Sequence, residues 1–194
     1  NKPKIAICKT ADWQLAHKDT VNAIALARFC AEKIAKGTVQ DFVLPKSLEN
    51  LREIQTRIML SEMSRSLAFE RDHYPKKLSS QISKQIYEGA SISYEQYSQD
   101  VHTAALARSI IDQLFHDEID LIIAPSAIGE APKGLTQTGD PIFCRTWTLM
   151  GLPCITLPLH LGPNGLPIGI QLVAGKGRDS LLLSVAHTMM NLQR

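Results

Sequence analysis

The sequence has 194 residues, of which 44% are hydrophobic and 21% charged, a composition typical of a globular protein rather than a disordered or fibrous chain. This length suffices for one α/β domain with a sizeable core and is short for two, so we expect residues 1–194 to form a single α/β unit. The net charge of +2 gives no reason to expect a nucleic-acid partner.

The cysteines and the apolar runs indicate a cellular compartment. No C-x-x-C pair occurs, and the cysteines lie within apolar runs, which favours reduced, buried thiols: Cys8, Cys30, Cys144 and Cys154. No apolar run approaches the roughly 18–20 residues of a membrane helix, and the beginning of the sequence lacks a signal-peptide pattern. We therefore expect a cytoplasmic protein without a membrane partner.

The first part of the chain predicts a strand, a helix and a second strand. The apolar run Ile5–Cys8 has strand length, and Asp19 or Thr20 is suited to cap the following helix. Gly37 stands where a helix C-cap favours a residue that tolerates positive φ. Residues 39–44 form the next strand candidate, and this order predicts a right-handed crossover in a partly parallel sheet.

The middle of the chain is predicted to be helical. Apolar residues at spacings of three and four predict two helices within residues 47–87. Ser93 and Gln96 have the spacing of a capping box, and an apolar stripe from there to Phe115 predicts a long third helix across a sheet face.

The last third predicts buried strands separated by rigid loops. Residues 121–124 are too apolar for a solvated face and predict a central strand that ends before Pro125. Asp140 is expected to cap a short helix with Pro141 as its first residue. Asn164-Gly165 predicts a hairpin between two strands, and Asp179 is expected to cap a last helix whose buried face comprises Leu182, Val185, Ala186 and Met189.

Chemical motifs are scarce. No serine lies in a strained glycine-rich turn, the histidines lack H-x-x-x-H spacing, and no G-x-G-x-x-G or phosphate-loop pattern opens a helix. The residues therefore predict no metal ion and no cofactor. Ligands of α/β sheets bind in loops beyond strand ends, which makes residues 125–153 a plausible ligand wall.

Several segments in this order resemble the C-terminal part of amidase signature hydrolases. They are DLIIAPS at 120–126, Ala131-Pro132, TGDPIFCRTWTLMGLP at 138–153 and GLPIGIQLV at 165–173. The resemblance implies the C-terminal portion of the amidase signature fold, a mixed β-sheet flanked by helices. It further implies a Ser-cisSer-Lys triad, in which a serine attacks an amide carbonyl and backbone N–H groups stabilise the oxyanion. The Gly/Ser-rich signature and lysine motif of that triad do not occur in residues 1–194, so no catalytic residue is assigned here.

The same resemblance suggests which residues bind substrate. Pro125 and Ser126, at the end of a buried strand, are expected at the pocket rim. The segment from Asp140 to Trp147 is expected to line the acyl side of the pocket, with Arg145 available for a polar or carboxylate group. The residues alone also allow structural roles, because Asp140 suits an N-cap and Trp147 suits a core.

Two hypotheses follow. In the first, the chain is the substrate-pocket half of a hydrolase that cleaves amide C–N bonds by serine nucleophilic catalysis, and it is inactive alone. In the second, the chain is a non-catalytic binding or subunit module of an amidotransferase-like complex. The expected partners of the chain are a small-molecule amide substrate and either the missing N-terminal half of the enzyme or another copy of the chain. A second polypeptide is expected because half of an interdigitated sheet leaves an unpaired strand edge.

Overall fold

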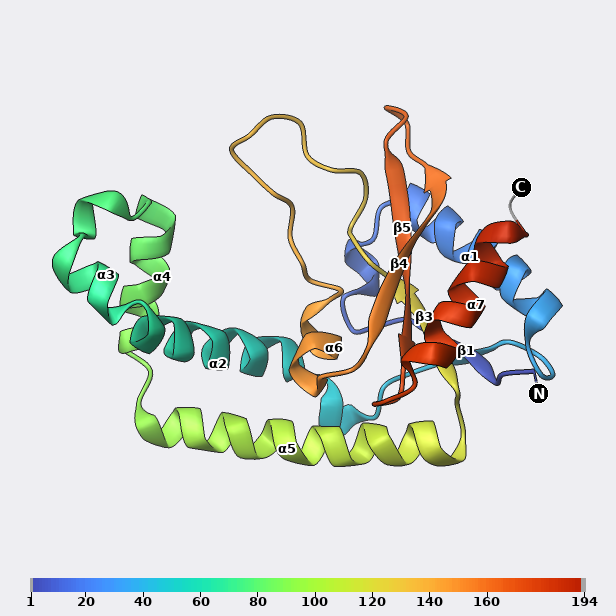
Figure 1. Ribbon diagram of the computed structural model, residues 1–194, viewed down its shortest axis with the longest axis horizontal. Helices are drawn as coiled ribbons and strands as arrows, with labels where there is room; N and C mark the ends of the chain where they lie inside the picture. The colour runs from blue at the N-terminus through green and yellow to red at the C-terminus, as the bar shows by residue number, and fades with distance from the viewer. Residues whose placement is uncertain (1, 193–194) are drawn as a thin grey trace.

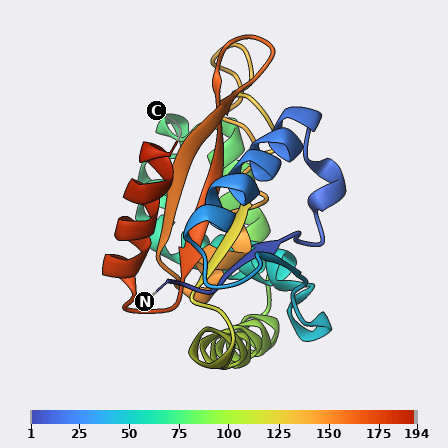
Figure 2. The same ribbon diagram turned by 90° about the vertical axis from the view of Figure 1, so that its right-hand side faces the viewer.

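The computed structural model describes residues 2–192 as a mixed five-stranded sheet between layers of helices (Figures 1 and 2). The strands are β1 (Ile5–Cys8), β2 (Gln40–Phe42), β3 (Leu121–Pro125), β4 (Cys154–Leu161) and β5 (Pro167–Ala174). Their order is β2-β1-β3-β5-β4. β1 pairs in parallel with β2 and β3, whereas β5 runs antiparallel to β3 and β4. The predicted α/β class and mixed sheet are confirmed.

Helices cover both faces of the sheet. The longer ones are α1 (Lys18–Ile34), α2 (Leu51–Ser66), α4 (Ser80–Ala90), α5 (Tyr94–Asp117) and α7 (Asp179–Asn191), and the short ones are α3 (Ala68–His73) and α6 (Arg145–Met150). Short 3-10 turns occupy Trp13–Leu15, Lys46–Leu48 and Pro75–Lys77. Within the described residues, no helix combines the length and apolar character needed to span a bilayer.

The alternation of side chains along the strands produces two cores. Ile5 and Ile7 of β1 pack with α1 and α7 on one face. Ala6 and Cys8 of the same strand pack on the other face with α2, α5 and α6. All residues of β3 are buried, as predicted for a central strand covered on both faces.

Helices α3 and α4, with the end of α2, form an arm that extends away from the sheet (Figure 1). The two longer helices of the arm approach very closely, since a Cβ placed on Gly89 would lie 1.9 Å from the carbonyl oxygen of Leu60. Glycine is therefore required for this helix contact. The prediction of two helices within residues 47–87 holds for α2 and α4 and omitted the short α3.

The structure corrects several predicted helix boundaries. Lys18 begins α1, with His17 at the N-cap, and the Thr20 hydroxyl donates instead to the carbonyl of Ile128 at 2.8 Å. α1 ends at Ile34, and Gly37 adopts its positive φ in the turn beyond the C-cap. Asp179 is the first residue of α7, not its cap.

The prediction for Asp140 and Pro141 was wrong. The carbonyl of Pro141 accepts a hydrogen bond from the Cys144 backbone N–H at 2.9 Å, so a separate turn occupies residues 141–144. Helix α6 begins only at Arg145, with Cys144 at its N-cap. Asp140 is consequently free to bind another side chain.

Candidate functional site

The carboxyl ends of the three parallel strands meet at one edge of the sheet. The loop after β1 contains Asp12, the turn after β2 leads into the start of α2, and the loop after β3 leads to α6. In α/β sheets, ligands bind outside the carboxyl ends of strands, where connections diverge. This edge is therefore the candidate site, and it includes the loop singled out from the sequence.

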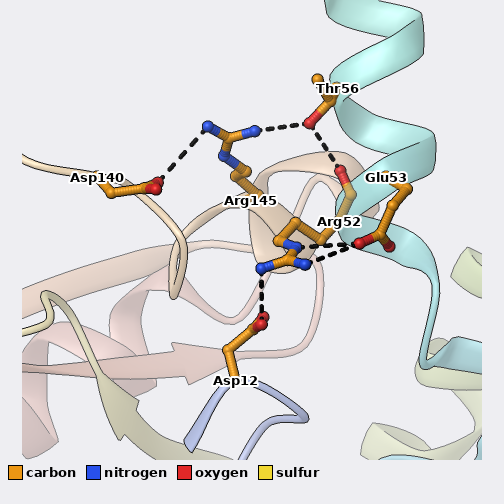
Figure 3. A network of polar contacts seen from close by, with 6 residues as sticks. All are labelled: Asp12, Arg52, Glu53, Thr56, Asp140 and Arg145. Carbon is orange, nitrogen blue, oxygen red and sulfur yellow. Dashed lines mark hydrogen bonds and ion pairs between the residues drawn. The ribbon is translucent and has the colours of Figure 1, made fainter. Parts of the chain in front are cut away.

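Two arginines at this edge form the polar network of Figure 3. Arg52, in the first turn of α2, donates from Nη1 to Asp12 at 2.7 Å and from Nη2 to Glu53 at 2.8 Å. Arg145, the first residue of α6, donates to the Thr56 hydroxyl at 2.6 Å. The network thus joins the loops after all three parallel strands.

Asp140 is the acidic partner of Arg145. Its carboxylate lies 3.6 Å from Arg145 Nη2, as Figure 3 shows. The hydrogen bond to Glu53 raises the pKa of Arg52, and the charges of Asp12 and Asp140 act in the same direction. The hydrogen bond from Arg52 lowers the pKa of Glu53. Nearby carboxylates therefore balance the positive charges of both arginines.

Pro125 and Ser126 are fixed to the start of α6 from the sheet side. Gln171 of β5 is buried, and its Nε2 donates to the carbonyls of Pro125 at 2.6 Å and Phe143 at 2.8 Å. The thiol of Cys144 donates to the Ser126 carbonyl at 3.3 Å. The sequence alone does not identify Gln171 as the link between the two loops.

Trp147 lies in the core and not at the surface. Its side chain is fully buried in the cluster formed with α2 and α5, and its Nε1 has no hydrogen-bond partner among the described residues. Among the predicted site residues, Asp140 and Arg145 are thus in contact. Pro125 and Ser126 are linked through Gln171 and Cys144 to the turn before α6. Trp147 lies in the core beneath α6.

A cavity of about 210 Å³ lies beside the network. Thr10, Asp12, Arg52 and Thr146 contribute to its polar wall, and Leu44 and Leu48 to its apolar wall. A larger hollow of about 370 Å³ opens at the amino ends of β1 and β2, near Lys36, on the edge of the sheet where α/β proteins rarely bind ligands. The smaller cavity is the better candidate.

Four residues of the network were not predicted from the sequence: Asp12, Arg52, Glu53 and Thr56. Asp12 and Arg52 each follow a predicted strand closely, and this position after a strand end was the available signal. Their pairing across 40 residues is not visible in sequence spacing.

Comparisons with known proteins agree with this fold. The sequence pattern of the Amidase family matches residues 1–183, so the chain belongs to the amidase family. It is 36% identical over 102 residues to the A-subunit of glutamyl-tRNA(Gln) amidotransferase from Picosynechococcus sp., a match that covers 49% of this chain and 20% of that protein. The corresponding protein of Neisseria gonorrhoeae is 38% identical over 74 residues, or 35% of this chain and 15% of that protein.

Solved structures show the same fold at lower identity. A chain from a vestigial protein complex, linked to the origins of an s-triazine catabolic enzyme, superposes with a TM-score of 0.85 at 20% identity, over 98% of this chain and 43% of that chain. For a 6-aminohexanoate cyclic dimer hydrolase the TM-score is 0.76 at 15% identity, over 100% of this chain and 45% of that one. The chain thus matches 15–20% of the length of these two curated relatives and less than half of the length of these solved chains.

Proposed function

We propose that this chain forms one wall of the substrate pocket of an amide hydrolase. The observation that carries the proposal is the Arg145–Asp140 pair beside the Arg52–Asp12 pair, at the ligand-binding edge of a member of the amidase family. The wall positions the amide substrate and does not itself cleave it.

The wall residues have distinct roles in this proposal. Arg145 and Asp140 present hydrogen-bonding groups to the acyl part of the substrate, and Arg145 is held in place by Thr56. Pro125 and Ser126 form the rim, at a position fixed by Gln171. Trp147 supports the start of α6 from the core.

Hydrolysis would use a serine nucleophile from a segment outside residues 1–194. The amidase signature resemblance supports this, because its Gly/Ser-rich motif and lysine motif do not occur in this sequence. The serine would attack the amide carbonyl, and the amine or ammonia would leave as the acyl-enzyme forms. Water would then release the carboxylate.

The test compares the 194-residue chain with the product of the whole reading frame that contains it. Ammonia release from simple amides is measured for both proteins. We expect activity from the longer product and none from the chain alone. Comparable turnover by the chain alone would refute the claim that catalysis needs another segment.

A second assay tests the role of Arg145 in the longer product. Arg145→Ala is expected to raise KM about tenfold with a smaller change in kcat, because the residue binds substrate in both ground and transition state. Arg145→Lys should recover part of the loss, and Arg71→Ala in the distant arm is the matched control. An unchanged KM in Arg145→Ala would remove this residue from the pocket.

The alternative is a non-catalytic component of an amidotransferase-like complex. It is favoured by the similarity to amidotransferase A-subunits and to a chain from a protein complex. The reading frame upstream of Asn1 discriminates the two. An in-frame lysine motif and Gly/Ser-rich segment would favour the enzyme, whereas a natural start at or near Asn1 would favour the non-catalytic component.

A further inference from the structure

The only Asn-Gly pair of the sequence, Asn164-Gly165, lies at the tip of the β4–β5 hairpin. Both residues are exposed, and Gly165 has a φ of 79° with open space where a Cβ would lie. Because glycine carries no side chain, its backbone nitrogen is less hindered than that of any other residue. The tip therefore holds a carboxamide carbon next to an unhindered backbone nitrogen.

Asn164 also holds the hairpin to the loop after β3. Its Nδ2 donates to Glu130 Oε2 at 2.6 Å, and its backbone N–H donates to Glu130 Oε1 at 3.0 Å. The Leu166 backbone N–H donates to the same Oε1 at 3.0 Å. Gly162 permits this approach, since a Cβ there would clash with the Glu130 side chain. These bonds form a Glu130–Asn164 latch between two segments that lie side by side (Figures 1 and 2).

The latch and the hairpin turn restrain any reaction between the two tip residues. The Gly165 backbone N–H donates to the carbonyl of Gly162 at 3.0 Å, and Glu130 holds the Asn164 carboxamide by its nitrogen. Attack of the Gly165 nitrogen on Asn164 Cγ requires both groups to leave these partners. The reaction rate therefore depends on how often the tip opens, and local opening of an exposed turn costs much less than global unfolding.

We propose that Asn164 is a self-modification site whose reaction releases the Glu130–Asn164 latch. In the opened tip, the Gly165 backbone nitrogen attacks Asn164 Cγ, so that a C–N bond forms and the Cγ–Nδ2 bond breaks. Ammonia leaves with the proton that the Gly165 nitrogen lost, and a cyclic imide remains. Water then opens the imide at either carbonyl and yields aspartate or isoaspartate. This inference goes beyond the proposed function, because it involves neither substrate nor turnover.

The product carries a carboxylate where the carboxamide faced Glu130. Both carboxylates are ionised at neutral pH, so that a donor–acceptor attraction becomes a repulsion between like charges. Isoaspartate also lengthens the main chain by one carbon, which alters the turn that presents the Leu166 N–H. The loop after β3, whose residues 131–140 are all exposed, then loses its attachment to the hairpin.

The first experiment follows the modification in the 194-residue chain by peptide mass spectrometry. The folded chain and the chain unfolded in urea are incubated in the same mildly alkaline buffer and analysed for isoaspartate at position 164. We expect conversion in the folded chain to be about three- to thirtyfold slower than in the unfolded chain. Glu130→Ala, which removes the latch, should convert at least about threefold faster than the natural folded chain.

Two outcomes of this experiment would overturn the proposal. Equal rates in the folded chain and in Glu130→Ala would show that the latch does not restrain the reaction. No isoaspartate in the folded chain, after about a hundred half-lives of the unfolded reaction, would show that the folded tip does not react.

The Asn50-Leu51 pair is the internal control for the chemistry. Asn50 is exposed like Asn164, but the side chain of Leu51 hinders attack by its own backbone nitrogen. In the unfolded chain, Asn50 should convert at least about tenfold more slowly than Asn164. Equal conversion at the two positions would refute the role of Gly165.

The second experiment measures release of the loop with Asn164→Asp, which carries the charge of the product. Lys133 lies three residues after Glu130 in the exposed part of the loop, so a held Glu130 restrains the segment that a protease must bind. Trypsin should cleave after Lys133 at least about fivefold faster in Asn164→Asp than in the natural chain. Cleavage after Lys77 in the arm should be unchanged and is the control.

The double variant Glu130→Gln with Asn164→Asp tests whether charge causes the release. The glutamine amide can donate to the new carboxylate, so cleavage after Lys133 should return towards the rate in the natural chain. The natural chain aged until Asn164 has converted should behave like Asn164→Asp, which covers the case that this variant fails to fold. Unchanged cleavage after Lys133 in the converted chain, or no recovery in the double variant, would contradict the proposal.

Discussion

Arg57 and Asp100 form a two-point ion pair that joins α2 to α5. Arg57 Nε and Nη2 each donate to one carboxylate oxygen of Asp100 at 2.7 Å. Asp100 is only 3% exposed, and Gln96 donates to the same carboxylate at 3.2 Å. The pair thus fixes the helix that leads to the arm against the helix that returns to the sheet.

Arg57→Met should destabilise the fold by about 2–3 kcal/mol, because it leaves a buried carboxylate without its cation in a pair that is partly open to solvent. Urea denaturation followed by circular dichroism measures this change. The matched control is Arg71→Met, whose partner Asp72 is exposed, and it should have no measurable effect. Equal losses of unfolding free energy in the two variants would show that burial of Asp100 does not strengthen its ion pair.

Gln171→Leu should destabilise the protein by about 2–4 kcal/mol, because two buried carbonyls lose a donor. The same denaturation experiment measures the loss. Gln113→Leu, at an exposed site on α5 where the side chain bonds to Asp117, should change stability by less than about 0.5 kcal/mol. Unchanged stability in the Gln171→Leu variant would mean that other groups or water donate hydrogen bonds to the carbonyls of Pro125 and Phe143.

Gly89→Ala should destabilise the contact between α2 and α4, although alanine favours helices more than glycine does. The added Cβ would meet a backbone carbonyl that cannot rotate away, and such overpacking costs about 1–3 kcal/mol. In Gly89→Ala, backbone amide hydrogen exchange should show that α4 opens faster than the sheet. In Gly37→Ala, where the Cβ would meet open space and only the positive φ is strained, exchange of α4 should be unchanged.

The stability of the tip of the β4–β5 hairpin should depend on pH through Glu130. Desolvation acts to raise the pKa of its carboxyl, but hydrogen bonds from Asn164 and Leu166 outweigh this and hold the pKa below its ordinary value of 4.5. Since the folded pKa is depressed, the stabilisation is present above 4.5 and is lost as pH falls through the lower folded value.

An NMR titration of the Asn164 and Leu166 backbone N–H signals measures this transition. We expect one step below pH 4.5 in the natural protein, and no such step in Glu130→Gln, which carries no titrating group. A midpoint above 4.5 would contradict the sign of the shift.

The strands were predictable because their signals are local. Residues 121–124 are continuously apolar, and a strand buried on both faces needs this composition. Asn164-Gly165 fits only a tight turn, and the structure has the hairpin there. The start of α6 was misplaced because Asp140 and Pro141 suit a helix start by local rules, whereas in the structure a separate turn occupies residues 141–144 and the helix begins at Arg145.

Only part of the candidate site could be predicted from the sequence, because contacts between residues far apart in the sequence complete it. Asp140 and Arg145 lie five residues apart in a conspicuous segment, but their network is completed by Thr56, 89 residues from Arg145. Such a contact depends on how α2 packs against α6, which single-sequence periodicity does not specify.

The direct pairing of β1 with β3 should let this chain tolerate a backbone cut or a change of length in the arm. The two strands are neighbours in the sheet, yet the whole arm lies between them in sequence and projects away from the sheet (Figure 1). A cut in the backbone near Pro75 would therefore leave two pieces held together by the sheet and both cores. Changes in the length of this arm should therefore leave the positions of Asp12, Arg52 and Arg145 at the sheet edge unchanged.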